Sequence, residues 1–536
     1  MKGIAVCQGI GIGKVYVFIE TKFEIDKYFV TDIVAETLIF LEAREKASEQ
    51  ITAIASGDEL DNEESQLLAA HEMMLMDDEL KNKILIEIND KKHCSQWATE
   101  DVFEEYILMF ENMENDYMKE RANDCRDIKH RLLGILMGVE DNNQVNIPEG
   151  SIIVANNLLP SHIINLKKNN IGGIVTSEGS ITSHLAILSK IIGIPTVLGV
   201  KNILDYVDNT TTVIVDGIKG EIIIEPSNKS IAEYSDRKKS YEEKVHKLKE
   251  LVGQESKTKS GKIIKLFANI GSPEDVEFAI ENDAEGIGLL RTELMFMNRN
   301  TMPTENEQFK AYVSIADAFI GKPVVIRTLD IGGDKNLSYL NIEKEMNPFL
   351  GYRAIRYCLG NKDIFKTQLK AIIRANIHGN VNVLFPMICT VDEIRMSKEL
   401  LQEAIDELKE SMVLPHEFLR IGIMIETPAA AITSDILAKE VDFFSIGTND
   451  LVQYTMAADR MNPNVSYLYN PENIAVIRLI EMTIKNAQKE GIDVGICGEA
   501  GSYGPLLDRI IDLGVNEISM SADSILNVRS IVRDHK

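Results

Sequence analysis

The chain has 536 residues, of which 45% are hydrophobic and 26% charged, a balance typical of globular proteins with several domains. Its formal net charge of -26 disfavours binding to nucleic acid or to an anionic membrane surface, because those partners carry charge of the same sign. The six cysteines have no CxxC spacing, and neither a signal peptide nor a long apolar run is found, so we expect a cytoplasmic protein with reduced thiols.

The first half of the sequence predicts an interrupted α/β domain. Residues 1–20 are expected to form two short strands around a tight glycine turn at 9–13, whose GxGxG spacing does not match a dinucleotide loop. Apolar residues then recur at helical spacing, acidic residues are dense, and glycine and proline almost vanish. We interpret residues 21–145 as an acidic bundle of about four helices, inserted into a small α/β domain that is formed by 1–20 and 146–225.

A histidine at the start of an expected helix is the main chemical feature of this domain. Short β-branched strands are expected at 152–155, 173–175, 195–198 and 213–216. A polar turn and an apolar helical run follow the second strand, and Thr182 or Ser183 is a natural N-cap that puts His184 in the first helical turn. Free backbone N–H groups and the positive helix end favour a phosphoryl group there, so we predict His184 as a phosphate-carrying nucleophile.

The second half of the sequence predicts a barrel. Residues 226–256 are polar and helix-prone, and we interpret them as a helical linker rather than only a solvated surface helix. In residues 257–536, eight strand candidates alternate with helical patterns, which is typical of a (β/α)8 TIM barrel. The expected strands are 266–269, 286–289, 324–328, 383–387, 422–426, 443–446, 494–497 and 517–520.

Charged residues gather where these strands end, and this is where TIM barrels carry their active sites. Arg291 and Arg327 follow strands directly, while Arg353, Arg460 and Lys335 lie in loops beyond strands. Each arginine alone is more simply explained by an ion pair on the barrel rim. Together, in so acidic a chain, they predict a small and strongly anionic ligand, because guanidinium groups bind phosphate and carboxylate in two-pronged geometry.

Three further residues at strand ends suit catalysis. Glu426 and Asp450 are hard oxygen ligands on neighbouring strand ends and predict a Mg²⁺ site, although helix capping is the alternative. Cys497 also ends a strand, and its position leaves packing and chemistry equally open.

Several long motifs in this sequence resemble those of phosphoenolpyruvate-utilising enzymes. Residues 179–184 resemble the phosphohistidine motif of that family, and its barrel signatures are similar to 286–293, 331–335, 425–429 and 442–451. Within the family the order of motifs over nearly the whole chain is that of the Enzyme I group of the bacterial sugar phosphotransferase system. Residues 70–75 and 119–122 are similar to the helical insertion of that group.

The resemblance implies a reaction and its partners. Phosphoenolpyruvate would bind in the barrel through Arg291, Arg327, Arg353, Arg460, Lys335 and the backbone near Asn449, with Mg²⁺ on Glu426 and Asp450. His184 would take the phosphoryl group, Cys497 would protonate the enolpyruvate to pyruvate, and the small phosphocarrier HPr would then accept the group on the helical insertion. The barrel would also form a homodimer.

Some positions differ from the family pattern. Ser180 stands where the family usually has a second glycine, and Lys190 stands where it has arginine. The residues after Glu499 also differ, and the sequence ends at Lys536, which leaves the helical closure of the barrel and its effect on dimer stability open.

Three other functions fit the sequence less well. Pyruvate phosphate dikinase and phosphoenolpyruvate synthase carry an ATP-binding domain ahead of the histidine domain, and residues before 146 show no ATP-grasp pattern. A non-catalytic sensor would have lost the arginines, carboxylates or histidine, and an aldolase or lyase would leave the first half of the chain without a role.

Overall fold

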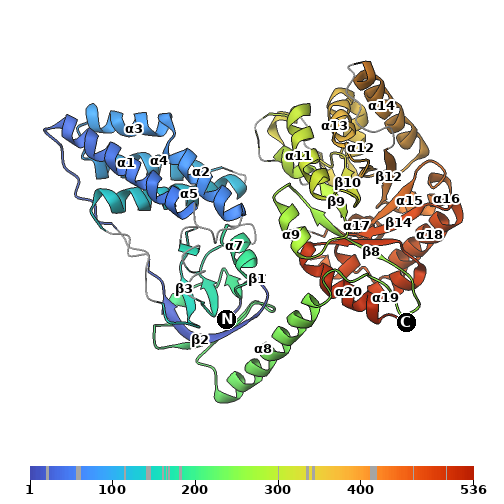
Figure 1. Cartoon of the computed structure of the whole chain (residues 1–536), viewed down its shortest axis with the longest axis horizontal. Coiled ribbons are helices and arrows are strands. Elements are labelled where there is room, and N and C mark those ends of the chain that lie inside the picture. The colour runs from blue at the N-terminus through green and yellow to red at the C-terminus, as the bar shows by residue number, and fades with distance from the viewer. Residues whose placement is uncertain are drawn as a thin grey trace. The chain divides into compact units, whose positions relative to one another are not determined.

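The computed structural model describes residues 1–536 except 20–22, 56–61, 114–115, 140–146, 160–161, 164–165, 167–169, 180–183, 298, 300, 333–336, 341–344, 411–418, 461, 463 and 503. The chain divides into two compact units, Met1–Val245 and His246–Lys536 (Figure 1). Among the described residues, no helix combines the length and the apolar character that a membrane span requires. Each of the six cysteines is free.

The first unit contains a mixed seven-stranded sheet in the order β1-β5-β4-β3-β2-β6-β7. Its central strands β2, β3, β4 and β5 run parallel, while β1, β6 and β7 pair antiparallel with their neighbours. The α/β fold predicted here is confirmed, and β7 is an additional strand. The bounds are β1 Ile4–Cys7, β2 Ile10–Val17, β3 Ile152–Ala155, β4 Gly173–Thr176, β5 Thr196–Leu198, β6 Thr212–Asp216 and β7 Glu221–Ile224.

The glycine turn predicted over residues 9–13 is wrong, because the turn is shorter and ends before Ile10. The chain turns at Gln8 and Gly9, whereas Gly11 and Gly13 lie inside strand β2. A Cβ at Gly11 would lie 2.3 Å from the Gly172 carbonyl oxygen, and one at Gly13 would lie 2.2 Å from that of Gly150. These glycines therefore allow close approach of two backbones, a use of strand glycine that local spacing does not distinguish from a turn.

A helical insertion lies between β2 and β3. Its helices are α1 Ile33–Ala55, α2 Asn62–Leu75, α3 Asp78–Asn89, α4 Ser95–Glu111 and α5 Asp116–Leu136, and they share one apolar core. The described helices number one more than the apolar pattern predicted. The side chain of Asp77 accepts a hydrogen bond from the Leu80 amide at 2.9 Å and caps α3, so that α2 and α3 are separate helices.

Helix α7 belongs to the first unit, and helix α8 begins in the first unit and ends in the second. Helix α7 spans His184–Ile192 and follows β4. Helix α8 spans Asn228–Lys249, and the boundary between the two compact units falls inside it. This helix lies within the residues that the sequence assigned to a linker.

The second unit is a closed barrel of eight parallel strands in the order β10-β11-β12-β13-β14-β15-β8-β9, which confirms the predicted TIM barrel. Its strands are β8 Lys265–Ile270, β9 Ile287–Arg291, β10 Val324–Arg327, β11 Val381–Phe385, β12 Arg420–Ile425, β13 Phe443–Gly447, β14 Asp493–Cys497 and β15 Glu517–Met520. Its helices are α9 Asp275–Glu281, α10 Glu293–Met297, α11 Glu305–Ala318, α12 Ile355–Gly360, α13 Lys362–Ala375, α14 Val391–Glu410, α15 Pro428–Ile432, α16 Ser434–Leu437, α17 Thr448–Met456, α18 Ile474–Glu490, α19 Gly504–Leu513 and α20 Ile525–Asp534.

The last helix, α20, completes the barrel after β15. Val528 and Val532 are fully buried in the barrel core. Arg529 is also fully buried, and it donates hydrogen bonds to Ser256 Oγ at 3.0 Å and to the Leu251 carbonyl at 3.1 Å. Helix α20 packs against β8, the strand that pairs with β15 where the barrel closes, so the helical closure that the sequence left open is present.

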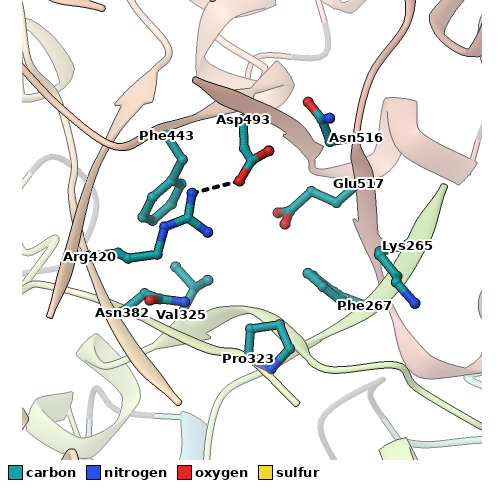
Figure 2. A pocket seen from close by; sticks show the side chains of 10 residues that line it. All are labelled: Lys265, Phe267, Pro323, Val325, Asn382, Arg420, Phe443, Asp493, Asn516 and Glu517. Carbon is teal, nitrogen blue, oxygen red and sulfur yellow. Dashed lines mark hydrogen bonds and ion pairs between the residues drawn. The ribbon is translucent and has the colours of Figure 1, made fainter. Parts of the chain in front are cut away.

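Each end of the barrel carries a polar cavity. The N-terminal ends of the strands surround a cavity of about 210 Å³, in which Arg420 pairs with Asp493 at 2.6 Å beside Glu517 (Figure 2). The C-terminal ends surround a larger one of about 490 Å³. Catalytic residues of TIM barrels lie at the C-terminal end, so this larger cavity is the candidate site.

Candidate active site

The larger cavity collects side chains from the ends of five barrel strands and the loops beyond them. Eight of the residues singled out from the sequence line it, although the barrel segments that carry them are far apart in the chain. These are Arg291, Arg327, Arg353, Glu426, Asn449, Asp450, Arg460 and Cys497. Lys335 lies outside the described residues.

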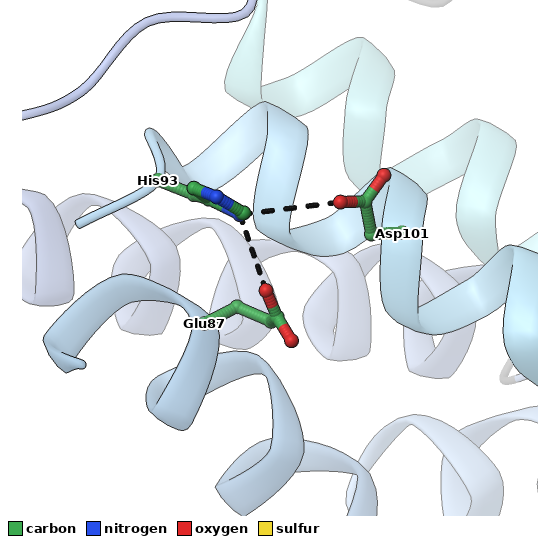
Figure 3. Close-up of side chains that lie close together, drawn as sticks. All are labelled: Glu87, His93 and Asp101. Atoms are coloured by element: carbon green, nitrogen blue, oxygen red, sulfur yellow. Dashed lines mark ion pairs between the residues drawn. The ribbon is translucent and has the colours of Figure 1, made fainter. Parts of the chain in front are cut away.

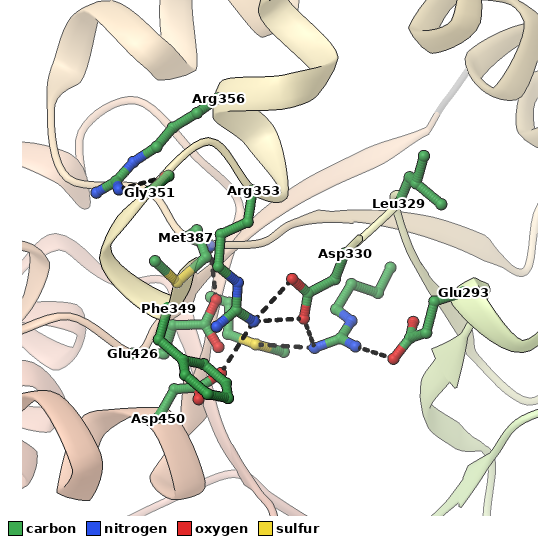
Figure 4. Close-up of polar contacts among 12 residues, drawn as sticks. Glu293, Leu329, Asp330, Phe349, Gly351, Arg353, Arg356, Met387, Glu426 and Asp450 are labelled. Carbon is green, nitrogen blue, oxygen red and sulfur yellow. Dashed lines mark hydrogen bonds and ion pairs between the residues drawn. The ribbon is translucent and has the colours of Figure 1, made fainter. Parts of the chain in front are cut away.

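Arg327 and Arg353 are both buried in the site, and Figure 4 shows Arg353 beside Asp330 and Asp450. Arg327 donates to Glu293 Oε1 at 2.5 Å and lies 3.1 Å from Asp330 Oδ2. Arg353 donates to Asp330 Oδ1 at 2.9 Å and to the Tyr454 hydroxyl at 3.0 Å. Burial opposes the charge of Arg327, but the neighbouring carboxylates outweigh it and raise its pKa. Both guanidinium groups are therefore fixed, charged and oriented in advance of any ligand.

Arg291 and Arg460 are less constrained. Arg291 is exposed at the end of β9, and none of the described carboxylates lies within ion-pair distance of it. The nearest carboxylate oxygen to Arg460 is Asp450 Oδ1, at 3.8 Å. A guanidinium without a close protein partner at the edge of a cavity is available to an anionic ligand.

Glu426 and Asp450 are both buried, at 1% and 7% exposure. The Met387 amide donates to Glu426 Oε1 at 2.6 Å, and burial together with the Asp450 carboxylate raises the pKa of Glu426. Asp450 Oδ1 is buried and accepts no hydrogen bond from the described residues. Two buried carboxylates with an unsatisfied oxygen, in a cavity whose described lining contains no histidine, fit a hard divalent cation.

Cys497 lies at the end of β14 with 2% of its surface exposed. Its thiol lies 3.4 Å from the Ile446 carbonyl oxygen, and burial raises its pKa to about 11. The thiol is therefore protonated at neutral pH and suits a proton donor better than a nucleophile. The next residue, Gly498, has φ of 102°, and a Cβ there would lie 2.5 Å from Thr448 Oγ1, so the strand can end at this point only with glycine.

Sequence reasoning missed two acidic residues that organise this cavity. Glu293 and Asp330 are 2% exposed and position Arg327 and Arg353. Asp330 lies three residues beyond Arg327, and Glu293 lies two beyond Arg291. The pattern of an acidic residue two or three positions after an arginine at a strand end could have indicated that both Glu293 and Asp330 belong to the site. Tyr469, whose hydroxyl donates to the Asn449 carbonyl at 3.3 Å, had no such signal.

His184 lies in the first unit as the first residue of helix α7. The proposed caps Thr182 and Ser183, and the variant position Ser180, fall outside the described residues. Lys190 is exposed in the last turn of α7, where a positive charge interacts favourably with the helix dipole.

The helical insertion brings its two family-like segments together. His71 is 3% exposed, and its Nε2 lies 3.3 Å from Asp124 Oδ1, while Arg121 donates to the other oxygen of Asp124 at 3.1 Å. The contact joins α2 to α5 around the buried Asp124 carboxylate, so removal of either partner would leave that carboxylate less well satisfied.

Comparison with known proteins agrees with this arrangement along most of the chain. Family models described as PEP-utilising enzyme match residues 2–121 (N-terminal), 147–220 (mobile domain) and 245–536 (PEP-binding domain). The chain belongs to the PEP-utilising enzyme family. The last of these models covers the barrel with its cavity, and the mobile-domain model covers His184.

Curated relatives narrow this assignment. Proteins named phosphoenolpyruvate-protein phosphotransferase from Priestia megaterium and Staphylococcus carnosus (strain TM300) are each 44% identical over 535 residues, which is 99% of this chain and 93% of theirs. The protein of that name from Bacillus subtilis (strain 168) is 44% identical over 532 residues, with the same coverage of both chains.

Proposed function

We propose that this chain is a phosphoenolpyruvate–protein phosphotransferase that takes the phosphoryl group of phosphoenolpyruvate onto His184 and releases pyruvate. The convergence of four arginines and two buried carboxylates in one barrel cavity carries the proposal. Four arginines and the four carboxylates of Glu293, Asp330, Glu426 and Asp450 leave that cavity formally neutral. A divalent cation adds the positive charge that a small polyanion needs.

The cavity residues have separate parts in the proposed reaction. Arg327 and Arg353, held by Asp330 and Glu293, would bind the phosphate, and Arg291 and Arg460 would bind the exposed end of the substrate. Lys335 and Asn449 belong to the same proposal as substrate-binding residues. Glu426 and Asp450 would hold Mg²⁺, which neutralises charge on the phosphoryl oxygens.

Proton movement completes the reaction. A nitrogen of neutral His184 attacks phosphorus, the P–O bond to the enol breaks, and its electron pair leaves with enolpyruvate. The Cys497 thiol gives its proton to the methylene carbon, which yields pyruvate and a thiolate that solvent reprotonates. The raised pKa of Cys497 keeps this proton in place until the enolate forms.

The next acceptor in the proposal is the small phosphocarrier HPr, which would dock on the helical insertion in the cytoplasm. Because this chain has a net charge of -26, a carrier with a basic docking face would bind it faster and more selectively.

We also propose a homodimer through the barrel. Ile432, Ile436 and Ile474 are 50–59% exposed on helices α15, α16 and α18, which pack against one another, and exposed apolar side chains of this kind suit contact with a second copy.

One experiment tests the central step. The full chain is incubated with Mg²⁺ and phosphoenolpyruvate labelled on phosphorus, and the protein is assayed for an acid-labile, alkali-stable label. We expect wild type to take up one label per chain and His184→Ala to take up none. Equal labelling of the two proteins, or none in wild type, would overturn the proposal.

A further inference from the structure

A cluster of potential metal ligands lies in the helical insertion. Glu87 is in the last turns of α3, His93 is in the loop that follows, and Asp101 is in α4 (Figure 3). One ligand atom from each lies within 4.8 Å of the others, and within the described part of the chain no other such group of three was found. His93 Nδ1 is 3.1 Å from Glu87 Oε2 and 3.9 Å from Asp101 Oδ2.

The facing atoms of this cluster lack hydrogen bonds. His93 Nδ1 and Glu87 Oε2 are both buried, and neither has a hydrogen-bond partner, although they are close enough for one. The oxygen is therefore misaligned with the in-plane direction of the ring nitrogen. Buried polar atoms without partners are rare in folded proteins, and two that approach each other in this way indicate a shared third partner.

The imidazole cannot easily turn to correct this geometry. Its ring stacks on Trp97 with centroids 3.5 Å apart and planes at 11°, and Phe29 packs against it at 5.8 Å. The residue is 9% exposed. A ring fixed between aromatic neighbours presents Nδ1 in a constant direction, as a metal ligand requires.

Lysines occupy the other oxygens of the two carboxylates. Lys91 Nζ lies 2.6 Å from Glu87 Oε1, and Lys27 Nζ lies 3.3 Å from Asp101 Oδ1. Each lysine lowers the local negative charge while it leaves Glu87 Oε2 and Asp101 Oδ2 on the histidine side. This arrangement orients one oxygen of each carboxylate toward Nδ1, as outer ligands do around metal sites.

We propose that Glu87, His93 and Asp101 bind one divalent transition-metal ion of the Zn²⁺ class. One imidazole nitrogen and two carboxylate oxygens form a ligand set that suits Zn²⁺ or Co²⁺, whereas Mg²⁺ prefers oxygen ligands alone. Solvent would complete the coordination. The ion would link the end of α3 to α4 and so stiffen the insertion. This site is separate from the one proposed for Mg²⁺ in the barrel, and it does not rest on the proposed function.

The sequence supplies a specific reporter, because Trp97 is the only tryptophan in the chain and stacks on His93. The full chain is freed of metal with a chelator and titrated with Co²⁺, and tryptophan fluorescence is measured. We expect saturable quenching with one ion per quenched chain and recovery when Zn²⁺ displaces Co²⁺. Glu87→Gln and Asp101→Asn should each weaken the apparent affinity by at least about tenfold.

A matched control is His378→Gln, which alters an exposed histidine whose Nε2 lies 2.7 Å from Asp317 Oδ1 in the barrel. It should leave the quenching curve unchanged. Circular dichroism and thermal unfolding without metal show whether each variant folds. If one of the two carboxylate variants, Glu87→Gln or Asp101→Asn, fails to fold, the affinity of the other tests the proposal. Unquenched fluorescence in wild type, or equal affinity in wild type and folded Glu87→Gln, would overturn the proposal.

Discussion

The two ends of the barrel are both polar, yet only one has the properties of an active site. At the C-terminal end, the side chains follow the strands and lie in loops, and Arg291 has no acidic partner among the described residues. At the N-terminal end, Arg420 is engaged by Asp493 at 2.6 Å and lies over the Phe443 ring, while Glu517 forms no ion pair with the described side chains. Polarity alone therefore does not define a site. Arginines left free for an anion, beside buried carboxylates, are the distinguishing feature.

The largest effect is expected from Glu426→Gln at the C-terminal end. Loss of a ligand charge should lower the rate of phosphorylation by phosphoenolpyruvate by about 10³-fold, since the cation that neutralises the phosphoryl group would be held poorly. The same change should raise the melting temperature measured without metal, because burial and Asp450 disfavour the Glu426 charge. Rapid-quench labelling and calorimetry measure the two quantities, and a variant that is active but less stable would contradict the metal assignment.

Cys497→Ala separates proton transfer from phosphoryl transfer. We expect pyruvate release to slow by about 10²- to 10³-fold while His184 still accepts label, as general acid catalysis contributes on that order. The raised thiol pKa, about 11, predicts that pyruvate formation in wild type does not decline through thiol ionisation between neutral pH and about pH 10. A decline near pH 8 to 9 that Cys497→Ser abolishes would show that the thiol is not the buried acid described here.

A pair of arginine variants compares the two ends of the barrel directly. Arg291→Ala should lower kcat/KM for phosphoenolpyruvate about 100-fold, the equivalent of about 3 kcal/mol of charged hydrogen bonding. Its melting temperature should not change, because Arg291 has no acidic partner among the described residues. Arg420→Ala should leave kcat/KM within about twofold of wild type. Steady-state kinetics measures both variants. A lower kcat/KM for Arg420→Ala than for Arg291→Ala would contradict the assignment of the active site to the C-terminal end of the barrel.

The smallest effect is expected from Glu517→Gln, on stability alone. Burial, together with Asp493, raises the pKa of Glu517 to about 8. The folded state thus holds a proton that the unfolded state releases above about pH 4.5, so this contribution to stability is present below pH 4.5 and is lost as pH rises through 8. At pH 8.5 the amide variant should be more stable than wild type by on the order of 1 kcal/mol, because it carries no charge to bury. Denaturant unfolding at pH 5 and 8.5 tests this, and an equal difference at both pH values would contradict it.

Much of the barrel site could be predicted because parallel strands bring their carboxyl ends to one edge. Placing Arg291, Arg327, Glu426 and Cys497 at strand ends was enough to predict that they meet. Asp330 and Glu293 could not be recognised in the same way, because their role depends on which guanidinium each one contacts. That choice is made by side-chain packing between neighbouring strands, which a linear pattern does not record.

By itself, the sequence determined the fold classes and the chemistry of the residues at strand ends, because strand and helix periodicity and residue type are local properties. It also determined the place of His184 at the beginning of a helix. Only the tertiary structure decided that Gly11 and Gly13 serve close backbone packing, that α20 closes the barrel, and that Glu87, His93 and Asp101 meet. Each of these depends on contacts between elements, whose geometry is set by packing of the whole core rather than by neighbouring residues.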